Sequence, residues 1–369
     1  AWVGDIDFKS WKYDKVTAMR QPGSTFKLFV YTEAMNQGLT PCDKRRDEYF
    51  SMQVFDKTQN KEVTWAPTNA NGYFTGDSIP LKAAFARSIN SVAVRLGQEM
   101  GINRIAETAH KMGIESPLDE TPALALGSSD INLLELANAY STIANDGKYV
   151  KRQLVTRILD RNGKEVYKSS ISEEQVIPYK SAFLMQQLLM GGTREPGGTS
   201  MSLNGYVGNF HDTDWGGKTG TSNNHSDAWF MGVSPNLVVG AWVGGEYRCI
   251  HFRTGALGQG SRTALPICGY FLEAVLKDPA FSKYRVKFGK PKDADITSSM
   301  YNCSSYAPRA KADTLRRDSI SIEEEIILDE DGNPVERQHP TKSPSNEEKS
   351  EPAATHKKAK EEAVNFDNL

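Results

Sequence analysis

A serine and a lysine three residues apart could form a nucleophile and its base. Ser24 follows the break Pro22-Gly23 and begins the apolar segment STFKLFVYTEAMNQG, so Ser24 and Lys27 are predicted to lie on one face of a helix. The Ser24 backbone N–H would fall in the unsatisfied first turn and could donate to an oxyanion. A lysine can act as base if burial or a second cation lowers its pKa from about 10.4 toward neutrality. The alternative is an N-cap serine followed by a solvated lysine.

A Lys-Thr-Gly-Thr sequence supplies a second cation. Lys218, Thr219, Gly220 and Thr221 follow two glycines and precede two strand-like runs, which predicts a strand. Glycine would let a substrate backbone approach that strand, and the lysine and threonine side chains could bind a carboxylate. The alternative is a glycine-broken edge strand with a solvated lysine. A phosphate-binding loop is excluded, because Asp212 stands where its first glycine is required.

A Ser-x-Asn sequence completes the set. It occurs four times, but only the copy at Ser88 and Asn90 falls in a break between helical segments. There the Ser88 hydroxyl could relay a proton toward a leaving amine, while Asn90 binds a substrate amide. The motif fits a simple helix cap equally well.

Interleaved helices and strands must position these residues. Helices are predicted from Ser24, over 81–100 with an interruption near Ser88, and over 101–112, 131–145, 180–190 and 267–276. Strands are predicted over 1–8, near 15–19, around Lys218, and over 228–233 and 237–243, with a turn at 234–236 and a separate hairpin over 151–168. This order favours an α+β fold with a largely antiparallel sheet.

Composition and cysteine spacing narrow the function classes. The 369 residues carry a formal net charge of -2, so no basic excess indicates nucleic acid, and no apolar run approaches a membrane helix. Apolar density falls after about residue 288, and residues 342–369 are predicted to be a disordered polar tail. The four cysteines lack metal-ligand spacing. A disulfide among them stays open, and the sequence favours four unpaired and mostly packed thiols: Cys42, Cys249, Cys268 and Cys303.

The three motifs, in this order, resemble those of the penicilloyl-serine transferase superfamily. Five blocks extend the resemblance to the transpeptidase domain of class A penicillin-binding proteins over roughly residues 1–275. They are RQPGSTFKLFVY, TWAPTNANGYFTG, LKAAFARSINSVAVRLG, ALGSSDINLLELANAYSTIANDGKYV and GGKTGTSNNHSDAWFMGVSPNLVVGAWVG. Cys268 stands where the family usually has tryptophan, a packing difference.

The resemblance implies a fold and a setting. The family fold is a five-stranded antiparallel sheet with helices on both faces and an additional all-helical subdomain. Residues 1–288 would form the transpeptidase domain and 289–341 a C-terminal extension. The family's glycosyltransferase domain and membrane helix have no counterpart in this sequence. The chain is therefore expected to be part of a membrane-anchored protein at the periplasmic face of the inner membrane.

The resemblance also implies roles for the motif residues. Ser24 would be the nucleophile, Lys27 its base and Ser88 the proton relay, while Asn90 binds the donor peptide. The donor's terminal carboxylate would bind the strand motif, Lys218, Thr219, Gly220 and Thr221, and the oxyanion hole would be the backbone N–H groups of Ser24 and Thr221. No metal or cofactor is expected. Expected partners are peptidoglycan stem peptides ending in D-Ala-D-Ala, β-lactams and other cell-wall synthesis proteins, with carboxypeptidase activity as a side reaction.

Two rival functions share the motifs. A serine β-lactamase needs a carboxylate that activates the deacylating water, and Glu135 is the one acidic residue in a faintly similar E-x-x-N setting. Its apolar helical neighbours favour a structural role. A non-catalytic module that senses β-lactams or peptidoglycan would carry the same motif set.

Overall fold

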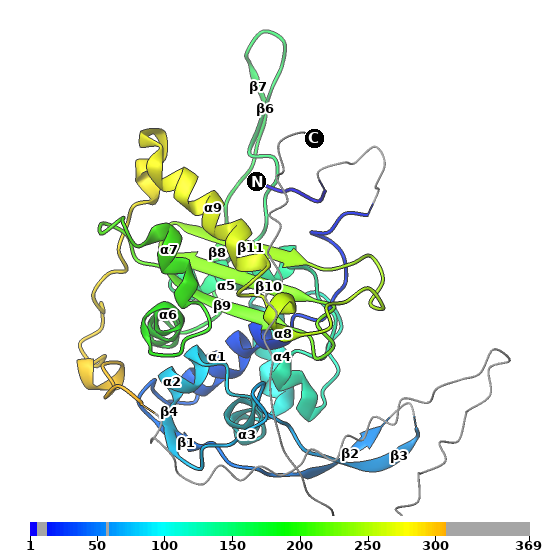
Figure 1. Ribbon diagram of the computed structural model, residues 1–369. Coiled ribbons are helices and arrows are strands. Elements are labelled where there is room, and N and C mark those ends of the chain that lie inside the picture. Colours follow the sequence, from blue (N-terminus) through cyan, green and yellow to red (C-terminus); the bar gives the residue numbers. More distant parts are fainter. Residues whose placement is uncertain (6–12, 57–58, 308–369) are drawn as a thin grey trace, which may run out of the picture. The chain divides into compact units, whose positions relative to one another are not determined.

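The computed structural model describes residues 1–5, 13–56 and 59–307 (Figure 1). All of these residues belong to one compact unit, Ala1–Arg317. The tail predicted over 342–369 lies outside the described residues, as does part of the strand predicted over 1–8.

Three antiparallel strands form the central sheet in the order β11-β10-β9. They are β9 (Gly216–Thr221), β10 (Ala228–Ser234) and β11 (Leu237–Val243). Alternate residues of β10 point to opposite faces, so Trp229 and Met231 belong to one apolar core and Phe230 to another. Every residue of β10 is buried as a result.

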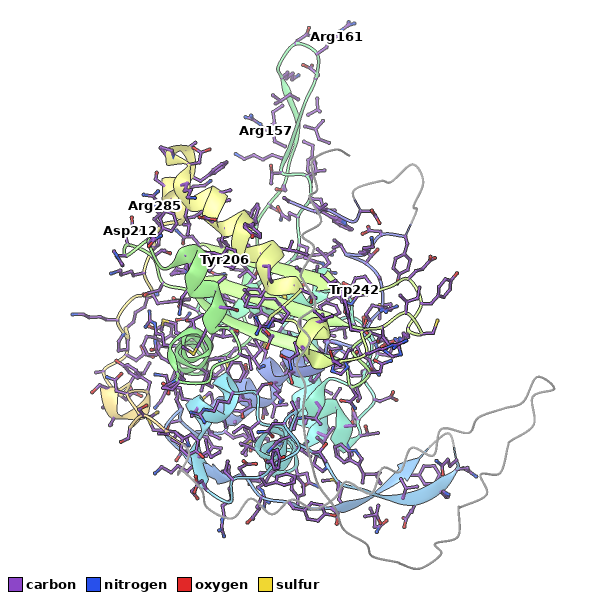
Figure 2. All side chains as sticks on the ribbon, viewed as in Figure 1. Arg157, Arg161, Tyr206, Asp212, Trp242 and Arg285 are labelled. Atoms are coloured by element: carbon purple, nitrogen blue, oxygen red, sulfur yellow. A yellow bond between two sulfur atoms is a disulfide. The ribbon has the colours of Figure 1, made fainter. Side chains whose placement is uncertain are left out.

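Helices cover both faces of this sheet (Figure 1). One face packs against α7 (Asn204–Val207) and α9 (Ala264–Lys277). There Gly269 lets α9 approach the Tyr206 ring, which a Cβ at that position would meet at 2.5 Å (Figure 2). The other face packs against α1 (Lys27–Asn36), α5 (Leu133–Ala144) and α6 (Tyr179–Arg194).

A helical block lies beside α1 and completes the larger core. It consists of α2 (Leu81–Ala86), α3 (Asn90–Met100) and α4 (Ile102–Lys111). Four two-stranded sheets lie outside the central one: β1 (Lys44–Arg46) with β4 (Ser78–Pro80), β2 (Met52–Asp56) with β3 (Lys61–Trp65), β5 (Lys148–Val150) with β8 (Glu173–Gln175), and β6 (Arg157–Leu159) with β7 (Glu165–Lys168). The remaining short elements are α8 (Gly255–Gly258), η1 (Gly23–Phe26), η2 (Pro122–Leu126), η3 (Met201–Leu203), η4 (Pro279–Tyr284) and η5 (Ser298–Met300).

The α+β class and most predicted elements are confirmed. The interruption near Ser88 separates α2 from α3, and the turn at residues 234–236 joins β10 to β11. The hairpin is present as β6–β7, whose residues are all exposed and include the labelled Arg157 (Figure 2). The strand predicted near residues 15–19 is wrong, because Lys15–Thr17 form a turn. Of the five strands expected in the main sheet, the described residues form three.

The prediction of four unpaired thiols is wrong for one pair. Cys42 and Cys303 form a disulfide across 261 residues of sequence. Cys249 is free and exposed, and Cys268 is free and buried on α9, where burial raises the pKa of its thiol to about 12. None of the helices in the described part of the chain has the length and apolar run that a bilayer crossing requires.

Candidate active site

Ser24 lies in the 3-10 turn η1, which runs directly into α1. It is therefore inside the helical segment and does not cap it, contrary to the N-cap alternative. Two hydrogen bonds fix the turn: the Thr25 hydroxyl donates to the Pro22 carbonyl at 2.7 Å, and the Tyr140 hydroxyl donates to the Thr25 carbonyl at 2.9 Å. These bonds close the turn that carries Ser24 and hold it against α5.

Glycines bring this turn against the end of β9. Gly23 has φ +53°, and a Cβ there would lie 2.6 Å from the Thr221 carbonyl oxygen and 3.1 Å from the Thr221 nitrogen. A Cβ at Gly220 would collide with the Pro22 carbonyl. Gly220 therefore makes room for the Ser24 turn, where the sequence suggested room for a substrate. The backbone of Gly23, the residue before Ser24, thus comes against the backbone of Thr221.

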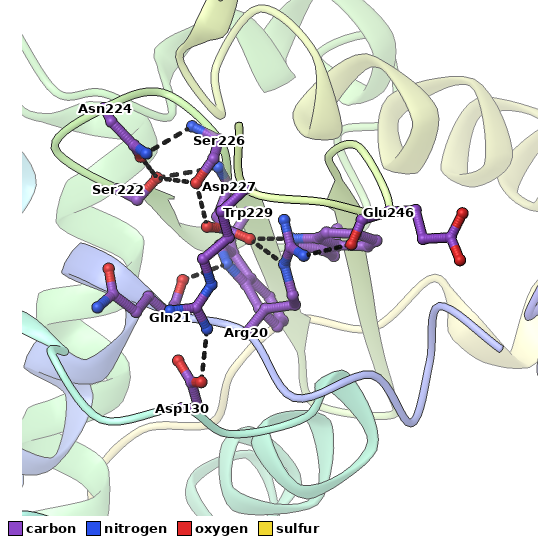
Figure 3. Close-up of polar contacts among 11 residues, drawn as sticks. Arg20, Gln21, Asp130, Ser222, Asn224, Ser226, Asp227, Trp229 and Glu246 are labelled. Carbon is purple, nitrogen blue, oxygen red and sulfur yellow. Dashed lines mark hydrogen bonds and ion pairs between the residues drawn. The ribbon is translucent and has the colours of Figure 1, made fainter. Parts of the chain in front are cut away.

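A buried ion pair clamps the segment that precedes Ser24 to β10 (Figure 3). Arg20 Nε donates to Asp227 Oδ1 at 2.6 Å, and the two side chains are 4% and 1% exposed. Asp227 also accepts from Ser226 Oγ at 2.6 Å and from Trp242 Nε1 at 3.0 Å. Two residues after Asp227, Trp229 Nε1 donates to the Gln21 carbonyl at 2.7 Å. These bonds fix the chain three to four residues before Ser24.

Two buried lysines meet at the Ser88 hydroxyl. Lys27 Nζ donates to Ser88 Oγ at 3.3 Å, to the Ser88 carbonyl at 2.8 Å and to Asn90 Oδ1 at 2.7 Å. Lys218 Nζ donates to Ser88 Oγ at 2.8 Å and to the Thr219 carbonyl at 3.0 Å. The three motifs predicted from the sequence therefore converge around one hydroxyl group.

Both lysines sit where a charge is costly, since Lys27 is fully buried and Lys218 is 1% exposed. Burial lowers the pKa of Lys218 to about 7. Burial, and after it the positive charge of Lys218, lower the pKa of Lys27 well below its usual range. The lowered pKa of Lys27 favours its neutral amine, the form that accepts a proton in general base catalysis.

Ser88 has a conformation that serine rarely adopts, with φ +60°. Such a residue costs on the order of 1–3 kcal/mol and persists only where its surroundings enforce it. The turn between α2 and α3 supplies part of that enforcement, because the Ser88 N–H donates to the Phe85 carbonyl at 3.1 Å. The left-handed backbone places the hydroxyl between the two lysines.

An amide and a carboxylate that the motif analysis did not identify hold Asn90. Asn69 Oδ1 accepts from the backbone N–H of Asn90 at 2.9 Å and of Ser91 at 3.1 Å, which caps α3. Asp47, 1% exposed, accepts from Asn69 Nδ2 at 2.7 Å and from Ser91 Oγ at 2.6 Å. The block TWAPTNANGYFTG, which contains Asn69, was the available signal; nothing in the sequence indicated Asp47.

The strand motif has two further partners that the motif analysis missed, Thr199 and Gly260. The Thr219 hydroxyl donates to Thr199 Oγ1 at 2.8 Å, and the Thr199 backbone N–H donates to the Ala86 carbonyl at 2.9 Å. Thr221 Oγ1 accepts from the Gly260 N–H at 3.2 Å. The loop that carries Thr199 therefore connects β9 to the α2 end that precedes Ser88.

The Glu135 carboxylate is engaged at the start of α5. Its Oε2 accepts from Ser116 Oγ at 2.7 Å, and its Oε1 accepts from Asn132 Nδ2 at 2.8 Å. Its backbone N–H donates to Asn132 Oδ1 at 2.9 Å, a reciprocal cap. This geometry is that of a helix N-terminus and supports a structural role.

Comparison with known proteins accounts for the convergence of these motifs. The family model for the penicillin binding protein transpeptidase domain matches residues 2–242. The chain belongs to this family. It is 32% identical over 252 residues to penicillin-binding protein 2D of Bacillus subtilis, and 31% identical over 312 residues to penicillin-binding protein 1A of Rickettsia felis. These alignments cover 66% and 78% of the chain but 35% and 37% of the relatives, so the chain spans about a third of their length.

Solved structures agree with this assignment. Penicillin-binding protein 1A from Haemophilus influenzae superposes with a TM-score of 0.67 at 26% identity, covering 75% of this chain and 45% of that one. The PonA1 protein from Mycobacterium tuberculosis in complex with penicillin V has the same fold, with a TM-score of 0.60 at 22% identity, covering 81% of this chain and 77% of that one. The resemblance to class A transpeptidase domains is thereby confirmed.

Proposed function

We propose that this domain is a D,D-transpeptidase that cross-links peptidoglycan stem peptides through an acyl-serine intermediate. Ser24 Oγ attacks the carbonyl carbon of the penultimate D-alanine, so a C–O ester bond forms and the C–N bond to the terminal D-alanine breaks. The Ser24 proton passes to neutral Lys27. A proton then reaches the departing amine through Ser88, and D-alanine leaves.

In the second half of the reaction, an amine of a neighbouring stem peptide attacks the ester carbonyl. The C–N cross-link forms, the C–O bond breaks, and Ser24 recovers its proton. Attack by water instead would give the carboxypeptidase side reaction. A β-lactam would acylate Ser24 in the same way, but its leaving group stays attached to the acyl part, which leaves a slow acyl-enzyme.

The observation that carries the proposal is the sharing of Ser88 Oγ by two lysines. A hydroxyl has two lone pairs and one O–H. Ser88 Oγ lies 2.8 Å from Lys218 Nζ and 3.3 Å from Lys27 Nζ, so the hydroxyl is within reach of both amines, as a proton relay requires. The lowered pKa of Lys27 supports its role as base.

The remaining assignments follow from position on β9. Gly23, which precedes Ser24, lies against the backbone of Thr221, and this closeness supports the Ser24 and Thr221 N–H groups as the oxyanion hole. Lys218, Thr219 and Thr221 would bind the carboxylate of D-Ala-D-Ala, with Gly220 holding the strand close, and Asn90 would bind the donor amide. We place the domain outside the cytoplasm, at the periplasmic face of the inner membrane, and the Cys42–Cys303 disulfide supports an oxidising compartment.

Intact-mass measurement after incubation with a penicillin tests this proposal. The wild type is expected to gain one drug mass that persists, and Ser24→Ala to gain none. Ser202→Ala is the matched control, because Ser202 is exposed and begins another Ser-x-Asn copy; it should acylate like the wild type. The absence of an adduct on folded wild-type protein would refute the mechanism.

Two further readouts separate the rivals. Rapid loss of the adduct with release of hydrolysed drug would favour a β-lactamase. A persistent adduct without D-alanine release from a stem peptide ending in D-Ala-D-Ala would favour a sensing module. Release of D-alanine that depends on Ser24 supports the transpeptidase.

A further inference from the structure

The segment after the last helix is bound across the active-site domain. We call residues 288–307 the C-terminal strap. The backbone N–H of Lys292 donates to the Tyr179 hydroxyl at 3.0 Å, and the Tyr301 ring packs edge-on against Phe183 at 5.4 Å. The disulfide from Cys303 to Cys42 then ties the strap to the loop after α1.

Three residues beyond the disulfide, Tyr306 makes a triple contact. Its hydroxyl donates to Asp77 Oδ2 at 2.9 Å, and its carbonyl accepts from Arg87 Nη2 at 3.0 Å. The Arg87 guanidinium also lies over the Tyr306 ring, 4.8 Å from the centroid. Cys303 and Tyr306 are thus two neighbouring points at which the C-terminal strap is attached to the rest of the domain.

Arg87 connects the strap to a second active-site loop. Its Nε donates to the Pro196 carbonyl at 2.9 Å. Pro196 lies just before Thr199, which bonds to Thr219 on β9 and to the Ala86 carbonyl. One guanidinium therefore links the strap, the 195–199 loop and the end of α2.

Arg87 immediately precedes Ser88, the residue held at positive φ between the two lysines. A strained conformation needs surroundings that over-determine it. The Ser88 backbone N–H donates to the Phe85 carbonyl. The bonds of the Arg87 side chain to Pro196 and Tyr306 hold the backbone of the residue directly before Ser88. Release of the strap would remove one of the two anchors of that side chain.

We propose that the C-terminal strap, pinned by the Cys42–Cys303 disulfide, acts through Tyr306 and Arg87 to hold Ser88 in its reactive position. Arg87 and Tyr306 are positioning residues, since they act on the reaction through Ser88. This inference rests on the proposed acyl-serine mechanism and assigns a function to residues beyond 288, for which the sequence predicted only an extension.

Stopped-flow acylation with a fluorescent penicillin tests the inference, because it separates the pre-covalent dissociation constant from the acylation rate constant. The double variant Cys42→Ser/Cys303→Ser and the single variant Arg87→Lys should lose acylation rate by about 10- to 100-fold, the range expected for a misplaced catalytic group. The dissociation constant should change much less. Each measurement is made well below the variant's unfolding midpoint.

Two controls distinguish positioning from general destabilisation. Cys249→Ser removes an exposed free thiol and should leave both constants unchanged. Tyr306→Phe keeps the ring and the carbonyl that contact Arg87, so it should retain acylation that Tyr306→Ala loses. Hydrogen exchange should accelerate at the Arg87 and Ser88 amides in the disulfide variant, with no change in β10.

Equal acylation rates in wild type, Arg87→Lys and the disulfide variant would overturn this inference and leave the proposed function intact. So would a parallel decline in binding and acylation that tracks thermal stability alone. Failure of the folded wild type to acylate would overturn the proposed function together with it.

Discussion

Replacing Lys218 by methionine should change how the stability of the domain depends on pH. Lys218 is 1% exposed, and burial lowers its pKa from 10.5 to about 7. At about 1.4 kcal/mol per unit, this corresponds to roughly 5 kcal/mol of burial cost when the lysine is charged. Methionine has a similar length and carries no charge, so Lys218→Met removes that cost.

The direction with pH follows from proton linkage. The folded protein binds this proton more weakly than the unfolded chain does, so unfolding takes up a proton between about pH 7 and pH 10.5. The burial cost is complete below that window and disappears as the pH rises through it. Wild-type stability should therefore rise relative to the variant by about 2 kcal/mol between about pH 7 and pH 9. Relief of the repulsion on Lys27 in the variant acts in the same direction.

Urea unfolding at a series of pH values measures this difference. At neutral pH the difference in unfolding free energy between wild type and Lys218→Met also includes the two hydrogen bonds that Lys218 donates. The decisive quantity is therefore the change of this difference with pH. Lys61→Met on β3 is the matched control, because Lys61 is exposed and its replacement should leave the pH dependence unchanged. A gap between wild type and Lys218→Met that stays constant across this window would refute the argument that Lys218 is held desolvated.

Three further outcomes are expected. Ser88→Gly and Ser88→Ala should both lose acylation rate by about 10²- to 10⁴-fold, because both remove the proton relay. The Ser88→Gly variant should be the more stable of the two by about 1–2 kcal/mol, because glycine accepts positive φ. Equal urea midpoints for the two variants would contradict backbone strain at this position. Asp227→Asn should lower the free energy of unfolding in urea by about 3–5 kcal/mol, because it breaks a buried ion pair. The control Glu99→Gln breaks a partly exposed ion pair and should cost under about 1 kcal/mol. Similar losses in the two variants would count against the Arg20–Asp227 ion pair as the contact that holds the segment before Ser24. Glu135→Gln should leave the deacylation rate of the penicillin adduct unchanged while weakening the α5 cap, and a marked slowing of deacylation would restore the β-lactamase hypothesis.

The sequence predicted the candidate catalytic groups better than the contacts that hold them in place. Candidate residues could be proposed because nucleophile, base and cation must be particular residue types at short spacings: Ser24, Lys27, Ser88, Asn90 and Lys218. The breaks that place them, such as the interruption between α2 and α3, also have local signals. Element order and the β10–β11 turn were accessible for the same reason.

The supports are long-range contacts between ordinary residues, and no local pattern encodes them. The carboxylate of Asp47 reaches the α3 cap through Asn69, and Arg20 finds Asp227 across 207 residues. The disulfide was missed because its two cysteines meet only after the strap has folded across the domain. Sequence spacing carries no information about such a meeting, so four packed thiols were the natural interpretation.

Because long-range contacts hold the motif residues in place, the site should be sensitive to amino-acid substitutions outside the motifs. Ser88, which contacts both lysines, depends on a backbone conformation that serine disfavours. The bonds that enforce it converge from the 195–199 loop and the strap onto Ala86 and Arg87. Substitutions far from Ser24 in sequence should therefore alter acylation whenever they loosen that convergence, even if every motif residue is intact.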